Sequence, residues 1–227
     1  TTFNSSIKQV DWSPDGNYIL SMKITEQNPS FHFSTVSIFH FEKSNQTLSL
    51  TYEASQPPSF LLLAVKWSPD GRYILSAFEN GLLINVFDRI SQAPIENPLV
   101  QLNLPSIQAV DWSPDNRFIA VRTLQELRIY EFKNLNLTLV DSISLSSLNT
   151  QAIVRWSPNG QYIAVQSVQT NSNALKAIVP GSQRLPLLLI SVDSSTGMLS
   201  QNGNTHPLAA FNVAWAVIVF FAQVTAF

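Results

Sequence analysis

The chain contains no cysteine among its 227 residues, and this absence excludes disulfide bonds, thiolate zinc sites and cysteine nucleophiles. Charge is scarce as well, since 13 basic and 15 acidic residues give a net charge of −2. A chain with so little charge has no broad positive field to attract a phosphate backbone, so we expect no nucleic-acid partner. Apolar residues are plentiful at 45%, which is enough for a substantial core.

Motifs for catalysis are also missing. The sequence contains no Gly-X-Ser-X-Gly elbow, His-Glu-X-X-His zinc helix, glycine-rich phosphate loop or EF-hand. The recurring Asp15, Asp70 and Asp115 could suggest a cation site. In the fourth copy of the motif, however, the uncharged Asn159 stands in place of the aspartate. Turn geometry explains them better. The sequence therefore predicts a protein that is not an enzyme and has no cofactor and no metal.

One seven-residue motif occurs four times. "VDWSPDG" at 10–16 returns as "VKWSPDG", "VDWSPDN" and "VRWSPNG". Each tryptophan of the chain follows a valine by two residues, and the intervals between tryptophans are 55, 45, 44 and 59 residues. The two shorter intervals match the length of a four-stranded propeller blade. The five tryptophans are Trp12, Trp67, Trp112, Trp156 and Trp215.

The letters after each tryptophan predict a tight turn between two strands. Proline presets φ at the second turn position, aspartate tolerates the third, and glycine can adopt positive φ at the fourth. Asn116 replaces that glycine in the third copy, and asparagine is enriched at positive φ. The four turn prolines are Pro14, Pro69, Pro114 and Pro158.

Short segments rich in aromatic and branched residues follow each turn, such as "YILSMKI" and "FIAVRTL", and two further such segments complete each unit. Helical periodicity is nowhere sustained. The sequence predicts an all-β fold, a β-propeller of four to five four-stranded blades of which the last is incomplete. We expect one domain over 1–227, with blade repeats near the following ranges: 7–56, 61–104, 107–147, 151–203 and a partial 208–227.

The "WSPDG" copies followed by "YIL" or "YIA" resemble the WD40-like repeats of TolB-type β-propellers, from about Ile7 onward. The repeats differ from WD40 repeats proper, because no Trp-Asp pair closes the third strand and Asp88 and Glu131 only approximate that acidic position. The resemblance implies blades stacked around an axis, each burying its faces against its neighbours. We expect the tryptophans to fill the gaps between blades.

The residue between valine and tryptophan alternates in charge from copy to copy, as Asp11, Lys66, Asp111 and Arg155. At equivalent positions, adjacent blades would present opposite charges. The pattern predicts a charge ladder between blades, although exposed ion pairs contribute only about 0 to 1 kcal/mol each.

The segment 208–227 has no charge and is long enough to span a bilayer as a helix. It also aligns with the start of a fifth repeat that lacks the turn letters, so we weigh a fifth-blade strand pair, a membrane segment and an altered end, and favour the first. An incomplete ring exposes strand edges, so the molecule needs either its N-terminal segment or a second chain, and a homo-oligomer through an unpaired edge is one alternative.

A long insertion in the fourth repeat is the best candidate for an interaction loop, with Lys176, Ile178 and Arg184 as the binding residues; an extra surface hairpin is the alternative. The leading hypothesis is a non-catalytic propeller scaffold that binds a protein or peptide. The alternatives are a propeller domain of a larger TolB-like or peptidase-associated protein, and a membrane-associated or secreted assembly protein using its apolar C-terminus. An exported location is slightly favoured over a cytoplasmic one.

Overall fold

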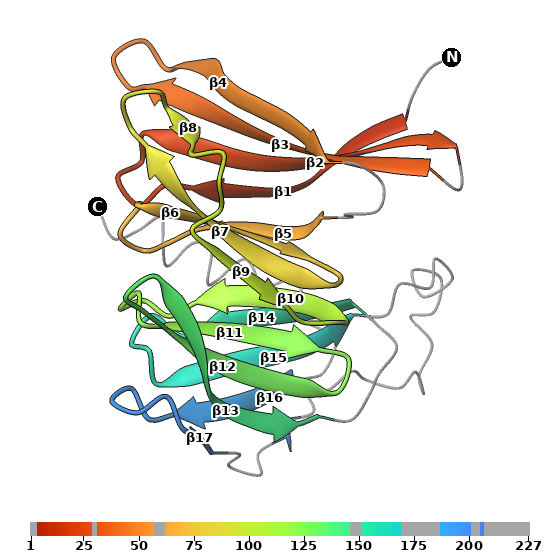
Figure 1. Ribbon diagram of the computed structural model, residues 1–227, viewed down its shortest axis with the longest axis vertical. Coiled ribbons are helices and arrows are strands. Elements are labelled where there is room, and N and C mark those ends of the chain that lie inside the picture. The colour runs from red at the N-terminus through yellow and green to blue at the C-terminus, as the bar shows by residue number, and fades with distance from the viewer. Residues whose placement is uncertain are drawn as a thin grey trace.

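The computed structural model describes the following residues: 4–28, 31–56, 62–145, 151–168, 187–200 and 205–206. Over these ranges the chain forms strands and turns and contains no helix. The all-β prediction is therefore confirmed. Four antiparallel sheets follow one another along the chain in an incomplete, propeller-like arrangement of blades (Figure 1).

Each sheet is an antiparallel meander, because strands that follow one another along the chain lie next to one another in the sheet. Sheet 1 contains β1 (Asn4–Trp12), β2 (Tyr18–Asn28), β3 (Phe31–Glu42) and β4 (Thr47–Gln56). Sheet 3 contains β10 (Ile107–Trp112), β11 (Phe118–Thr123), β12 (Glu126–Lys133) and β13 (Asn136–Ser144). These two sheets have four continuous strands.

In the other two sheets the outermost strand is divided into two short pieces that pair with the same neighbour. Sheet 2 contains β5 (Leu62–Trp67), β6 (Tyr73–Phe78), β7 (Gly81–Asp88), β8 (Ala93–Pro94) and β9 (Val100–Asn103). Sheet 4 contains β14 (Gln151–Trp156), β15 (Tyr162–Val168), β16 (Leu187–Val192), β17 (Leu199–Ser200) and β18 (Thr205–His206).

The recurring motif forms the turn between the first two strands of every sheet. In the first copy, the Gly16 amide donates to the Ser13 carbonyl at 2.8 Å and Gly16 has φ of +67°. Asn116 replaces the glycine of the third copy at φ of +63°, which confirms the prediction that asparagine takes the left-handed position there.

The serine of the motif holds this turn together. The Ser13 hydroxyl donates to the Asp15 carboxylate at 2.6 Å and accepts the Tyr18 amide at 2.8 Å. The same pair of bonds recurs at the other three turns. Because Ser13 is buried, these bonds satisfy polar groups that the packed sheets would otherwise leave unpaired.

The core lies between the sheets, as three apolar clusters that join sheet 1 to 2, 2 to 3 and 3 to 4. Trp67, Trp112 and Trp156 each lie in one of these clusters, on the face of their sheet that packs against the preceding sheet. All three are at most 7% exposed. They fill the gaps between sheets as their size and apolar surface require.

Trp12 differs from the prediction. Its side chain is 48% exposed, although it occupies the same place in the motif and makes the same edge-to-face contact, here with Phe41 at 5.5 Å. No described sheet precedes sheet 1 (Figure 1). The burial of this position comes from the neighbouring sheet, and the described residues provide no such neighbour for the first sheet. Trp215 and the segment 208–227 lie outside the described residues.

Among the described ranges, no helix has the length and apolar character needed to cross a bilayer.

Candidate functional site

The first strands of the four sheets lie side by side, with β1 next to β5, β5 next to β10 and β10 next to β14. The sheets extend outward from these strands, so side chains between them lie at the inner side of the arc. The structure brings together here the four alternating charges, Asp11, Lys66, Asp111 and Arg155. We call these four residues the axial cluster.

Lys66 occupies the middle of the axial cluster. Its Nζ lies 3.7 Å from Asp11 Oδ1 and 3.7 Å from Asp111 Oδ1. Arg155 Nη1 lies 3.3 Å from the same Asp111 oxygen. The Lys66 side chain is only 12% exposed and that of Arg155 is 46% exposed. The ion pairs therefore connect four consecutive sheets, and the innermost cation is largely shielded from solvent.

The two aspartates also accept backbone hydrogen bonds from the next sheet. Asp11 Oδ2 accepts the Trp67 amide at 2.8 Å, and Asp111 Oδ2 accepts the Trp156 amide at 2.9 Å. Gln9 adds a parallel link, because its side chain bonds the amide and the carbonyl of Val65. In each aspartate, one carboxylate oxygen accepts the backbone hydrogen bond, which fixes the orientation of the group, and the other oxygen faces a cation.

Burial raises the pKa of the Asp11 carboxyl above its ordinary value of 3.8, against the lowering effects of Lys66 and the Trp67 amide. A carboxylate with a raised pKa takes up a proton more readily than an exposed one. Two cations and two carboxylates leave the axial cluster with no net charge. It can therefore orient a polar molecule, but it offers no excess positive charge for a phosphate.

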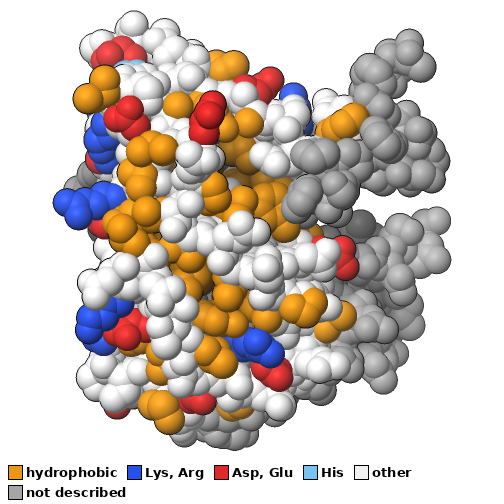
Figure 2. Space-filling view, in the orientation of Figure 1, with side chains coloured by type: hydrophobic (Ala, Val, Ile, Leu, Met, Phe, Trp, Pro, Cys, Tyr) orange, Lys and Arg blue, Asp and Glu red, His pale blue; other side chains and the backbone are white. Residues whose placement is uncertain are grey.

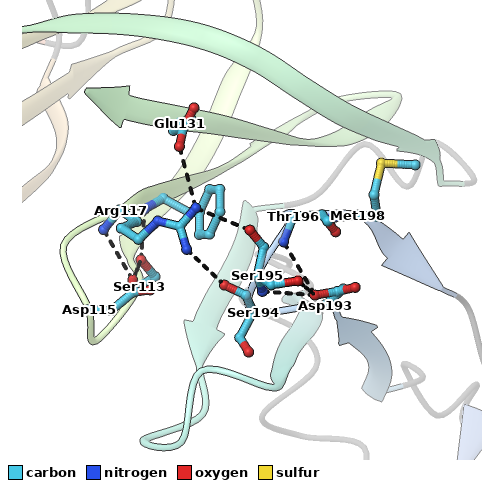
Figure 3. Close-up of polar contacts among 10 residues, drawn as sticks. Ser113, Asp115, Arg117, Glu131, Asp193, Ser194, Ser195, Thr196 and Met198 are labelled. Atoms are coloured by element: carbon cyan, nitrogen blue, oxygen red, sulfur yellow. Dashed lines mark hydrogen bonds and ion pairs between the residues drawn. The ribbon is translucent and has the colours of Figure 1, made fainter. Parts of the chain in front are cut away.

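Charged side chains gather along the edge of the molecule where the motif turns lie, on the left in Figure 2. Figure 3 shows one group, in which Arg117 connects sheets 3 and 4. Its guanidinium donates to the carbonyls of Ser194 and Ser195 at 3.2 and 3.1 Å and reaches Glu131 at 3.4 Å. The turn that it contacts is closed by bonds to Asp193, so this group holds two sheets together.

Arg89 makes the corresponding link between sheets 1 and 2, because its Nη1 lies 2.5 Å from Asp15 Oδ2. Burial acts to raise the pKa of the Asp15 carboxyl, but bonds from the Ser13 hydroxyl, Arg89 and the Asn17 amide outweigh it and lower that pKa to about 2. The ionised form of Asp15 is therefore the form that the folded chain stabilises.

We expect Asp15→Asn to lower the free energy of unfolding at pH 7 by about 1 kcal/mol or less, because the ion pair is partly exposed. A carboxyl with a lowered pKa contributes stability above its ordinary value of 3.8, and that stability is lost as the pH falls toward about 2. Urea unfolding of both proteins between pH 7 and pH 2 should show the difference shrinking over this window. Asp115→Asn, in a turn without an arginine pair, is the control, and an equal pH-dependent loss there would contradict the assignment.

Arg122 is a buried charge that the sequence analysis missed. It is 3% exposed and occupies the place that Met22 and Ala77 take in sheets 1 and 2. Its Nη1 donates to the carbonyls of Thr123 and Glu126, while its Nε has no partner, and burial lowers the pKa of the guanidinium. A single charge within the apolar strand "FIAVRT" was the signal in the sequence.

Lys176, Ile178 and Arg184 lie outside the described residues, so the candidate interaction loop stays a prediction. The described residues contain no group of three or more side chains suited to hold a metal ion. Asp15, Asp70 and Asp115 lie in separate turns and bond the serine of their own motif.

No family model and no curated protein matches the sequence. Solved structures of propeller-like proteins do match the fold. A protein from Lactobacillus plantarum matches with a TM-score of 0.62 at 18% identity, over 88% of this chain and 55% of its own. A candidate 6-phosphogluconolactonase from Bacteroides uniformis matches with a TM-score of 0.59 at 14% identity, over 87% of this chain and 72% of its own.

A puromycin hydrolase also matches, with a TM-score of 0.52 at 14% identity, over 90% of this chain and 30% of its own. The chain thus spans about half the length of the Lactobacillus plantarum neighbour. At these identities the likeness shows the fold. The prediction of a non-catalytic binding scaffold is corrected by this comparison, because the neighbours of the fold include candidate lactonases and a hydrolase.

Proposed function

We propose that the chain forms part of a propeller enzyme of the hydrolase type, and that its axial cluster acts on a small neutral ester or lactone. The observation that carries this proposal is the pair formed by Asp11 and Lys66, a carboxylate and an ammonium 3.7 Å apart at the inner side of the arc. The names of the lactonase and hydrolase neighbours support the reaction class. The neutral charge of the cluster favours an uncharged substrate over a phosphorylated one.

Hydrolysis of such a substrate needs a general base that takes a proton from water, and a positive group that stabilises the negative oxygen of the tetrahedral intermediate. In the proposed step, Asp11 takes a proton from water as the water oxygen bonds to the carbonyl carbon, and the Lys66 ammonium stabilises the negative carbonyl oxygen. When the intermediate collapses, the carbon–oxygen bond of the ester breaks and the leaving oxygen takes the proton from Asp11. The carboxylate and the ammonium are then regenerated.

Asp11 suits the role of base better than Asp111. Asp111 faces two cations, Lys66 and Arg155, and its side chain is 14% exposed, whereas Asp11 faces Lys66 and is 24% exposed. A carboxylate that faces fewer cations is the stronger base, and its larger exposed fraction lets a water molecule reach it. Its Trp67 hydrogen bond keeps it in place through the reaction.

Asp11→Asn should lower kcat/KM by at least about 100-fold, because general base catalysis contributes about that much or more. Asparagine keeps an oxygen for the Trp67 amide, so the fold should remain intact. The rates of hydrolysis of glucono-δ-lactone and p-nitrophenyl acetate, followed against pH, provide the measurement. In the unsubstituted chain the rate should rise as the pH passes upward through the raised pKa of Asp11.

Asp70→Asn is the matched control, since the fourth motif already has Asn159 at that place, and it should keep full activity. Equal activity in the Asp11→Asn protein would reject Asp11 as the base. Failure of the unsubstituted chain to hydrolyse either substrate above the buffer rate would reject the proposed function.

A further inference from the structure

The three interfaces between sheets repeat one aromatic arrangement. In each, an aromatic ring at the start of the second strand of one sheet packs toward the tryptophan of the next sheet. Between sheets 1 and 2, the ring centroid of Tyr18 lies 4.9 Å from that of Phe87 and 6.3 Å from that of Trp67. Between sheets 2 and 3, the ring centroid of Tyr73 lies 5.1 Å from that of Phe132, which lies 5.4 Å from that of Trp112. In the third interface Phe118 and Trp156 share a cluster. Each interface therefore has two sides. One sheet contributes a single aromatic ring, and the next sheet contributes the face that carries its tryptophan.

Sheet 1 exposes the face that carries its tryptophan, and no described sheet covers it. Ile7, Val10 and Trp12 are 66%, 51% and 48% exposed. The residues at the same three places in sheets 2 and 3 are at most 5% exposed; they are Leu62, Val65, Trp67, Ile107, Val110 and Trp112. Leu48 and Leu50 on β4 are each 54% exposed as well. We call this surface the front face.

Sheet 4 exposes the face that carries the aromatic ring at the start of its second strand, and no further described sheet covers it. Ile153, Tyr162 and Leu189 are 44%, 38% and 43% exposed. The matching residues of sheet 3 are at most 8% exposed; they are Ala109, Phe118 and Ile129. Tyr162 stands where Tyr18, Tyr73 and Phe118 stand in the other sheets. We call this surface the rear face.

The charges at the two ends are also complementary. The axial cluster alternates in sign from Asp11 to Arg155, so a further sheet after Arg155 would continue the pattern with an acid. Asp11 at the other end of the chain is that acid. Arg155 is the most exposed member of the cluster, at 46%, and is accessible to such a partner.

We propose that two copies of this chain associate head to tail, the rear face of one copy packing on the front face of the next. Tyr162 then packs against Trp12 and Phe41 of the next copy, as Tyr18 packs against Trp67 and Phe87 within the chain. The occupant is a second copy because one chain carries both halves of an interface that it already forms three times. The contact uses sheet faces and is heterologous, so copies form a closed ring or an open chain according to their rotation.

The test is the sedimentation velocity of the full chain over a range of concentrations. The unsubstituted chain should form dimers and larger species as its concentration rises. Trp12→Ala and Tyr162→Ala should each weaken association at least tenfold, because each removes one half of the interface. An equimolar mixture of the two variants should form dimers and nothing larger, since each variant then keeps one working face.

Ile90→Ala is the control, because Ile90 is 95% exposed in the turn between β7 and β8, away from both faces, and its loss should leave association unchanged. A chain that stays monomeric to about 100 μM overturns the proposal. An effect of only one of the two face variants also overturns it, since a symmetric contact or a different partner surface would then be in use. The readout is independent of hydrolysis.

Discussion

Trp67→Ala should lower the free energy of unfolding by about 4 kcal/mol, the range found when a large buried side chain is truncated. Trp67 is 5% exposed and lies between two sheets, with its ring 4.8 Å from Phe87 and 6.3 Å from Tyr18. Alanine would leave a cavity that neither rigid sheet can fill. Equilibrium urea unfolding, with the slope unchanged, is the measurement.

Two variants separate packing from other causes. Trp12→Ala removes the same residue from the same motif at a half-exposed place, so it should cost about 1 kcal/mol, measured at a dilution that keeps the chain monomeric. Trp67→Phe keeps an aromatic ring and removes an indole N–H that has no partner, so it should cost far less than alanine. Equal losses at positions 12 and 67 would contradict the account of inter-sheet packing.

Local geometry is what the sequence predicted best. The motif turns, the strands on either side of them and the positive φ of Asn116 depend on residues that are adjacent in the chain, so propensity and steric limits suffice. The role of the motif serine was missed. Ser13 bonds Asp15 and the Tyr18 amide, and a serine in a turn looks like any other small polar residue until its burial is known.

The repeated motif does not predict how deeply the same motif position is buried in each sheet. Trp12 and Trp67 have the same local sequence, yet one is half exposed because its environment depends on the neighbouring sheet. Arg122 illustrates the same limit, since a charged residue in a strand is expected at the surface and this one is only 3% exposed. Non-local packing decides both cases, and the number of sheets on each side is not written in the motif.

The positions of the axial cluster were predictable from the sequence, and its hydrogen bonds were not. Equivalent positions in a repeat lie next to each other, so the alternation of Asp11, Lys66 and Asp111 could be placed in advance. The hydrogen bonds from the Trp67 and Trp156 amides could not, because they depend on the rotation of one sheet against the next. Those bonds orient the carboxylates, and the raised pKa of Asp11 follows from burial that only the assembled sheets create.

Lys66→Glu should lower the free energy of unfolding by about 3 to 5 kcal/mol, or roughly 10 °C in the melting temperature, because it removes the close counterion of Asp11 and adds a like charge among partly buried carboxylates. Glutamate at this place puts a third carboxylate beside Asp11 and Asp111, each of which the Lys66 ammonium now approaches at 3.7 Å. Lys66→Met, which removes the charge and keeps most of the length, should lose less.

A second reversal measures the coupling between sheets directly. Asp11→Lys in the Lys66→Glu background restores one of the two ion pairs, so it should recover part of the lost stability and leave the repulsion from Asp111. Because Lys66 is only 12% exposed, 0.5 M salt should rescue little of the loss. Thermal unfolding of the single and double variants gives the coupling energy as the difference from additivity. Additive losses, or equal losses for Lys66→Glu and Lys66→Met, would mean that the close approach of these charges does not stabilise the stacked sheets.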